Sequence, residues 1–136
     1  MHTVGTFTFD SPEEARETYQ SVDPAAQTVV REVAKAMAFD REEYGERVTD
    51  DVVDTAHDAL FASLLRVTVG TREEYDEWRD AHPGEVAETG HERVDNVVWH
   101  VGPTGETVSA TFQDQEEAAV ATLRRQAFGR LYRELF

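Results

Sequence analysis

Two runs of alternating apolar and polar side chains flank the tetrapeptide "GPTG" at residues 102–105. This pattern is typical of a β-hairpin, because successive side chains of a strand point to opposite faces and glycine-containing turns reverse the chain. A loop made of these four residues alone pairs Trp99 with Val108. The sequence therefore predicts an antiparallel hairpin over residues 94–113, at the centre of a small sheet.

Four helices are expected before the hairpin, and capping signals mark the starts of three of them. Ser11 is followed by a proline and, three residues on, by a glutamate, as in a capping box. Asp23-Pro24 repeats the signal and predicts a second helix. A third helix is expected from about Asp51, and Thr71 with the glutamate three residues later predicts a fourth, short one. The inward face of the third helix is expected to carry Val53, Ala56, Leu60 and Leu64.

Shorter segments complete the expected fold. Residues 3–9, 66–70 and 85–89 have the composition of short strands. A long helix is predicted from Asp114 to the end of the chain, where apolar residues recur at helical spacing. We therefore expect one α+β domain over residues 1–136, in which N-terminal helices and the C-terminal helix pack on an antiparallel sheet.

The charge of the chain is strongly one-sided. It has 28 acidic and 13 basic residues, a formal net charge of −15, and Lys35 is its one lysine. Like charges repel in dilute buffer, whereas at molar salt the Debye length falls to about 3 Å and removes most of the repulsion. The composition predicts a halophilic protein in a K⁺-rich medium, since an ordinary acidic protein leaves the depletion of lysine unexplained. It argues against nucleic-acid binding, which requires clustered Lys and Arg.

Several other classes are disfavoured by what the sequence lacks. Without Cys the chain has no disulfide and no thiolate ligand or nucleophile. The longest strongly apolar run, residues 59–65, is far shorter than the roughly 20 residues of a membrane-spanning helix. The N-terminus has no basic region followed by an apolar run, as a secretory signal would. We therefore expect a cytoplasmic protein with no membrane partner.

Arg124 is the charge that stands out, because it lies near the middle of the apolar stripe of the C-terminal helix. A charged group there must be paired or reach solvent along its stem. It is either an anion clamp for a carboxylate or phosphate ligand, or a structural salt bridge to a neighbouring acid or a dimer contact. The stripe is wide enough to be covered on two sides, one of them a second subunit. The expected interface residues are Leu123, Phe128, Leu131, Tyr132 and Leu135.

Three further side chains are candidates for a ligand site. His57 projects between apolar residues of the third helix and is expected to face the core, either as hydrogen-bonded structure or in a polar pocket with Arg124. In the predicted hairpin register, His100 and Ser109 are diagonal neighbours on the outer face of the sheet. They are a nucleophile–base pair on one interpretation and part of a solvated sheet face on the other.

No motif predicts a metal or a cofactor. His82, His91 and His100 are evenly spaced, but no pair has the short spacing of a typical zinc motif. The glycines match neither a phosphate-binding loop nor a dinucleotide fingerprint, and no nucleophile elbow is present. We therefore expect neither a metal nor a cofactor.

Four segments of the chain have distinctive sequences: "DPAAQTVVREVAKAM", "DALFASLL", "VDNVVWH" and "ATFQDQEEAAVATLRRQAFGRLYREL". Together they resemble an uncharacterised protein family, a domain of unknown function, of halophilic archaea. The resemblance covers nearly the whole chain and implies a haloarchaeal cytoplasmic protein. It implies no activity, cofactor or catalytic residue.

Three functional hypotheses follow from these features. The first is a non-enzymatic interaction or regulatory module that uses the apolar face of its C-terminal helix, in a homodimer or with another protein. The second is a binder of a small anionic ligand, or an enzyme, with Arg124 and His57 or His100 in a pocket. The third, DNA binding through exposed arginines of the last helix, is disfavoured by the net charge.

Overall fold

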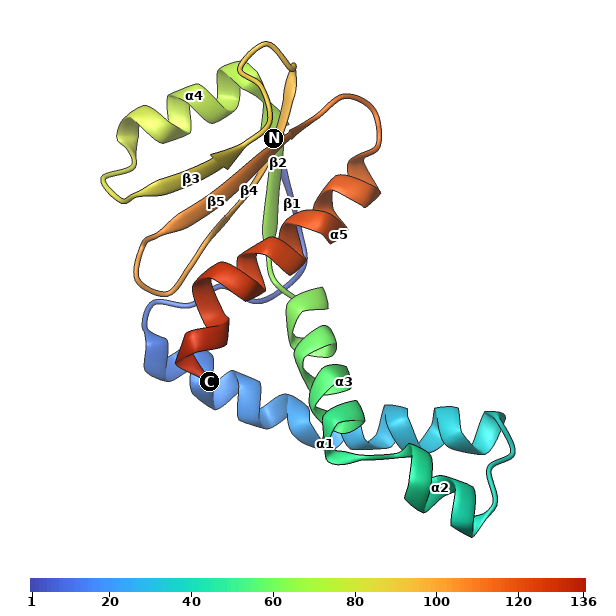
Figure 1. Ribbon diagram of the computed structural model, residues 1–136. Helices are drawn as coiled ribbons and strands as arrows, with labels where there is room; N and C mark the ends of the chain where they lie inside the picture. The colour runs from blue at the N-terminus through green and yellow to red at the C-terminus, as the bar shows by residue number, and fades with distance from the viewer.

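A five-stranded mixed sheet organises the fold, in the order β1-β2-β4-β5-β3 (Figure 1). The computed structural model describes every residue from Met1 to Phe136. The strands are β1 (His2–Val4), β2 (Val67–Thr71), β3 (Val86–Thr89), β4 (Asn96–Val101) and β5 (Thr107–Phe112). The helices are α1 (Pro12–Ala36), α2 (Arg41–Arg47), α3 (Asp50–Ser63), α4 (Arg72–Ala81) and α5 (Glu116–Ala127). A π-helical turn (Phe128–Tyr132) and a 3₁₀ turn (Arg133–Leu135) follow α5.

The predicted α+β class and the central place of the hairpin are confirmed, and the sheet departs from the expectation in one pairing. β1, β2, β4 and β5 pair antiparallel, but the edge strand β3 is parallel to β5. The chain reverses between β3 and β4 and again between β4 and β5, so β3 and β5 run in the same direction. The sheet is therefore mixed rather than antiparallel throughout.

The register of the hairpin differs from the predicted one by one residue. Trp99 pairs with Ser109, not with Val108. The loop has three residues between Gly102 and Glu106: the Gly102 N–H donates to the Glu106 carbonyl at 2.8 Å, and Gly105 has a φ of +88°. A type I turn followed by a residue in the left-handed region is the usual three-residue hairpin, and it adds one residue on the returning strand.

This shift decides which side chains share a face, because one residue of slip moves a strand's side chains to the opposite side of its partner. Trp99 and Ser109 face α4, where Trp99 packs with Tyr75 and Trp78. His100 and Val108 face the other way, toward α5. Both faces of the hairpin are covered, so the predicted solvated outer face is wrong: His100 is 1% exposed and Ser109 2%.

The main core lies between the sheet and α5, with the ends of α1 and α3 closing it. Phe61 of α3 is fully buried and meets the aromatic rings of Phe9, Tyr132 and Phe136. Contacts of this kind each add about 0.5–1.5 kcal/mol to the burial of the rings. The C-terminus is therefore held against the N-terminal helices, near the start of α1 (Figure 1).

α4 begins at the predicted capping box, which is confirmed. The Glu74 N–H donates to the Thr71 hydroxyl, and the Glu74 carboxylate accepts from the Thr71 N–H at 3.0 Å. These two bonds satisfy N–H groups that have no partner in the first turn of a helix. Since Thr71 is also the last residue of β2, the cap fixes the direction in which α4 leaves the sheet.

α1 is one helix that passes through Pro24, so the predicted start of a second helix at Asp23-Pro24 is wrong. Its C-terminal half pairs with the start of α3, and α2 joins them (Figure 1). We call residues 25–56 the helical arm. Figure 1 shows that the C-terminal half of α1 and α2 extend away from the sheet. No helix of the chain is both long enough and apolar enough to cross a membrane.

Candidate functional site

Arg124 ties α5 to the edge of the sheet. Its Nε donates to the Leu65 carbonyl at 3.0 Å, and its Nη2 donates to the Val4 carbonyl at 3.3 Å. It forms no ion pair with any acidic side chain of the chain, so the expected salt bridge is replaced by two backbone carbonyls. Carbonyls at the ends of strands have free lone pairs, and a guanidinium can reach two of them at once.

His100 lies on the same side of the sheet as Arg124, and both of its ring nitrogens are occupied. Nδ1 lies 2.6 Å from the Arg66 carbonyl, which can only accept, so Nδ1 carries the proton. Nε2 then accepts from the Tyr132 hydroxyl, also at 2.6 Å. Burial lowers the pKa of His100 to about 4; the Arg66 hydrogen bond opposes this shift and the charge of Arg124 adds to it. His100 is therefore neutral and has no free nitrogen with which to act as a base.

His57 ties α3 to α1. Its Nε2 donates to the Tyr19 carbonyl at 2.6 Å, and its ring stacks on Tyr19 with 3.7 Å between centroids. Its Nδ1 lies 3.6 Å from a carboxylate oxygen of Asp23. The structure thus brings Arg124 and His100 to one segment, Leu65–Arg66, whereas the polar contacts of His57 are on α1.

Ser109 does not meet His100, so the nucleophile–base interpretation is wrong as well. The observed register places the two side chains on opposite faces of the sheet. On its own face Ser109 lies 3.0 Å from the hydroxyl of Tyr75 in α4. Ser109 lines a polar cleft between α4, β3 and the loop 90–93. Sequence reasoning did not predict this cleft.

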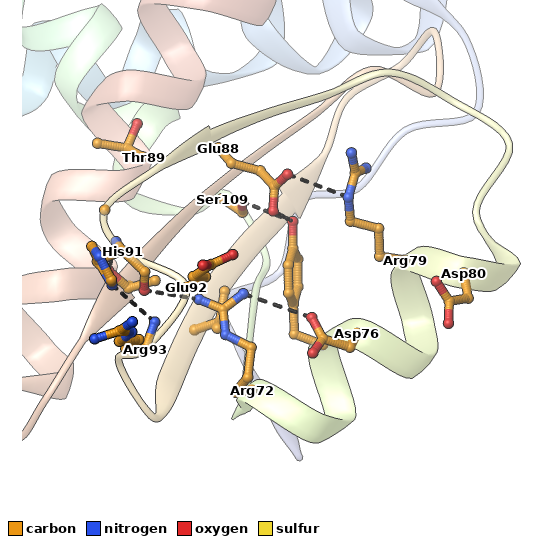
Figure 2. A pocket seen from close by; sticks show the side chains of 14 residues that line it. Arg72, Asp76, Arg79, Asp80, Glu88, Thr89, His91, Glu92, Arg93 and Ser109 are labelled. Carbon is orange, nitrogen blue, oxygen red and sulfur yellow. Dashed lines mark hydrogen bonds and ion pairs between the residues drawn. The ribbon is translucent and has the colours of Figure 1, made fainter.

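This cleft has a volume of about 860 Å³ and is lined by 14 residues, of which 2 are hydrophobic (Figure 2). Figure 2 shows Arg72 and Arg79 of α4 reaching from one wall toward Glu88 of β3 and the loop. Arg79 Nε is 3.3 Å from a Glu88 oxygen, and the Tyr75 hydroxyl donates to the other Glu88 oxygen at 2.8 Å. Since that phenol has one proton, the Ser109 hydroxyl is the donor in the Ser109–Tyr75 bond.

This arrangement is suited to binding rather than to proton transfer. Burial raises the pKa of Tyr75 to about 12; the Ser109 hydrogen bond opposes that shift, and Glu88 adds to it. Tyr75 therefore keeps its proton at neutral pH. Ser109 has no basic partner to accept its proton, which an activated nucleophile requires.

The far edge of the cleft is fixed by the loop that follows β3. Arg72 Nη2 donates to the His91 carbonyl at 3.1 Å, and the His91 N–H donates to Thr111 Oγ1 at 3.2 Å. Gly90 has a φ of +106°, and a Cβ there would overlap the Thr111 hydroxyl. Arg72 Nε has no hydrogen-bond partner and is shielded from solvent. An unsatisfied buried donor of this kind costs about 1–3 kcal/mol.

The expected interface on the C-terminal helix needs correction, because the chain itself covers it. Leu123 and Tyr132 are fully buried, and Phe128 and Leu131 are at most 9% exposed. Leu135 is partly buried and packs against the same core. The apolar stripe is wide because the sheet covers one side of it and the helices α1 and α3 meet the other.

The exposed apolar side chains are found instead on the helical arm. Val29, Val33 and Met37 lie along one side of α1 and are 43%, 52% and 59% exposed. They border a groove of about 530 Å³ between α1, α2 and α3, which we call the arm groove. It is lined by 10 residues, 9 of them hydrophobic, and Arg47 is the one charged member.

Comparison with known proteins identifies the family and no activity. The sequence matches the "Family of unknown function (DUF5809)" over residues 6–133. The chain belongs to this family. No curated protein and no solved structure matches it. Both the polar cleft and the arm groove of this DUF5809 protein lie within the matched range. These two sites therefore carry the information about function, because a fold or a family of unknown function does not specify a role.

No group of three or more His, Cys, Asp or Glu side chains in this DUF5809 protein is arranged to hold a metal ion.

The sequence contained few signals that the residues lining the polar cleft and the arm groove would form sites. The polar alternation Thr107, Ser109, Thr111 pointed to a hydrophilic sheet face, but the one-residue error in register assigned it to solvent. The helical spacing after Pro24 places Val29, Val33 and Met37 on one face, but spacing alone does not show that they stay exposed beside α2 and α3.

Proposed function

We propose that this DUF5809 protein is a non-enzymatic interaction module that forms a homodimer through its arm groove. The observation that carries the proposal is the row Val29, Val33 and Met37, exposed beside a groove of apolar side chains. Contiguous exposed apolar surface is uncommon on monomeric proteins and marks interaction sites. In a chain of net charge −15 it is the more notable, because 30% of the residues are charged.

A second copy fits this surface because the arm presents both halves of a contact. The row on α1 lines one side of the groove and is itself about half exposed, so it can both project and receive. A two-fold axis would place the row of one copy in the groove of the other, which is the self-complementary arrangement of most homodimers. Because these side chains are about half exposed, burying the rest of each contributes roughly 1 kcal/mol before the loss of rotational and translational freedom.

The dependence on salt separates this partner from a basic one. Residues 25–56 hold eight acidic and four basic residues, a net charge of −4, and this charge repels itself across a two-fold axis. Screening weakens the repulsion, so a homodimer becomes tighter as salt rises. A complex with a basic protein would instead become weaker, because screening removes its attraction.

We expect that Val33→Asp and Met37→Asp, tested separately, each weaken dimerisation at least about a hundredfold, because each places a charge in an apolar contact. Sedimentation equilibrium in molar KCl measures the dissociation constant. Leu64→Asp is the matched control. The expectation that Leu64 faces inward is wrong: it is 39% exposed and does not line the groove, so this variant should dimerise like the wild type.

The proposal fails if the wild-type chain is a strict monomer in molar KCl at every concentration tested. It also fails if both arm variants dimerise as tightly as the Leu64→Asp control. Far-ultraviolet circular dichroism confirms that each variant retains its helices. A dimer that dissociates as KCl is added would point to a contact driven by charge and not by the groove.

We also propose that the protein works in the concentrated KCl of a halophilic archaeal cytoplasm. The excess of 28 acidic over 13 basic residues, the single lysine and the absence of cysteine support this setting. That residues 1–136 form one domain remains a prediction.

A further inference from the structure

We propose that the polar cleft between α4, β3 and the loop 90–93 is a binding site for a small anion that carries a carboxylate or a phosphate group. The cleft is distinct from the arm groove: the two share no lining residue. Its volume of about 860 Å³ is within the range of small-molecule sites, roughly 300–1,000 Å³. With 2 hydrophobic residues among 14, it suits a hydrophilic ligand better than an apolar one.

A surplus of hydrogen-bond donors favours an anion. Each guanidinium has five N–H groups. Arg72 donates one hydrogen bond to the His91 carbonyl and lies 3.7 Å from a carboxylate oxygen of Asp76. Arg79 has one contact with a protein acceptor, the Glu88 carboxylate. Most of the N–H groups of the two arginines therefore have no protein acceptor.

Two of the four acids that line the cleft are already engaged. Glu88 takes the Tyr75 proton on one oxygen and faces Arg79 with the other, and Asp76 faces Arg72. A ligand that brings oxygens rather than protons complements what is left. Arginine forks bind carboxylate and phosphate groups with two parallel hydrogen bonds, which gives both strength and orientation.

The floor of the cleft is also polar. Ser109 and Thr111 place hydroxyl groups on a sheet face that α4 otherwise covers with aromatic rings. The oxygens of both are engaged within the chain: the Ser109 hydroxyl donates to Tyr75, and Thr111 Oγ1 accepts from the His91 N–H. The Thr111 hydroxyl proton has no acceptor in the chain, so it can be donated to the polar part of a bound molecule.

The unsatisfied Arg72 Nε is consistent with a missing acceptor. Its N–H is shielded from solvent in this conformation, and a turn of the guanidinium toward the cleft would give it a ligand oxygen.

Two acidic side chains limit which ligands can enter the cleft. Asp80 and Glu92 line the cleft without an ion-pair partner, and their charge repels long polyanions such as nucleic-acid backbones. The site therefore suits a small mono- or dicarboxylate or a monophosphate.

The test uses succinate and inorganic phosphate as probes, titrated into the full chain in KCl and followed by calorimetry. We expect at least one probe to bind with millimolar or better affinity. Arg72→Gln and Arg79→Gln should each weaken that binding at least tenfold, because each removes a charged fork. Arg125→Gln is the matched control, since Arg125 is an exposed arginine of α5 outside the cleft, and it should leave the affinity unchanged.

Asp76→Asn separates lost binding from lost folding. It removes the carboxylate that faces Arg72, so it should bind the probe as tightly as the wild type or more tightly. The proposal is overturned if neither probe binds, or if Arg72→Gln and Arg79→Gln bind like the Arg125→Gln control. Preference for succinate over phosphate, or the reverse, identifies the source of the anionic group. Met37→Asp should bind the probe normally, so the failure of this proposal and that of the dimer are distinguishable.

Discussion

Transfer from molar to millimolar KCl is expected to lower the unfolding temperature of the wild-type chain by about 10 °C or more. The chain carries a net charge of −15, and its self-repulsion falls as ions screen it. The loss is expected to reach several kcal/mol, comparable with the whole stability of an ordinary domain. For a chain of this size, a change of about 3 kcal/mol corresponds to a shift of about 10 °C.

The ion pairs of the structure do not compensate for this repulsion. Seven are formed, among 28 acidic residues, and two of these involve histidine. Most carboxylates therefore face solvent without a cation beside them. Exposed pairs of this kind each contribute about 0–1 kcal/mol. The solvent ions, and not the basic side chains, must supply most of the neutralisation.

Thermal unfolding followed by circular dichroism at several KCl concentrations checks this expectation. The control is the double variant Glu42→Gln, Glu46→Gln, which removes two exposed charges of α2 and should show a smaller dependence on salt. Sucrose at matched osmolality tests whether exclusion of solute alone accounts for the effect. Equal unfolding temperatures of the wild type in millimolar and molar KCl would contradict the expectation and the halophilic setting with it.

Acidification from pH 6.5 to pH 4 is expected to remove about 3 kcal/mol of stability through His100 alone. Burial lowers the pKa of His100 from 6.5 in the unfolded chain to about 4 in the folded one. Between these values the unfolded state binds a proton that the folded state does not. Stability is therefore fully present above pH 6.5 and declines as the pH falls toward 4.

Urea unfolding at pH 7 and at pH 4, in molar KCl, measures this loss. His100→Gln removes the titrating group, so its stability should decline less than that of the wild type by about 3 kcal/mol. Many carboxylates also titrate near pH 4, but they are common to both proteins and cancel in the comparison. Tyr132→Phe removes a donor to the neutral ring but leaves that ring buried, so it should retain most of the wild-type pH dependence. A parallel decline in all three proteins would refute the assignment to His100.

The fold class could be predicted because its signals are local. The alternation on both sides of residues 102–105 and the capping box at Thr71 each act within a few residues, and both are confirmed. The register could not be predicted with the same accuracy. The sequence of the turn is compatible with a four-residue loop and with a three-residue loop. The left-handed φ of Gly105 in the structure selects the three-residue loop.

The environment of Arg124 shows a second limit. Its place on the apolar stripe could be derived from helical spacing, and so could the need for a partner. Its partners are the backbone carbonyls of Val4 and Leu65. Every residue has a backbone carbonyl, so the amino-acid sequence does not indicate which ones Arg124 will contact. The cleft was missed for a related reason. Arg72, Glu88 and Ser109 come from α4, β3 and β5, and they meet because β3 pairs parallel to β5 across the hairpin.

Pro24 has a consequence for how the molecule opens. A proline has no N–H, so the Gln20 carbonyl lacks its usual partner midway along α1. The buried residues of α1 beyond this point are Ala26, Val30 and Ala34, which lie outside the main core. Amide exchange should therefore begin in the distal half of α1 and in α2 while β4 and β5 stay protected. The least protected part of the chain is thus the same segment that carries the exposed apolar row.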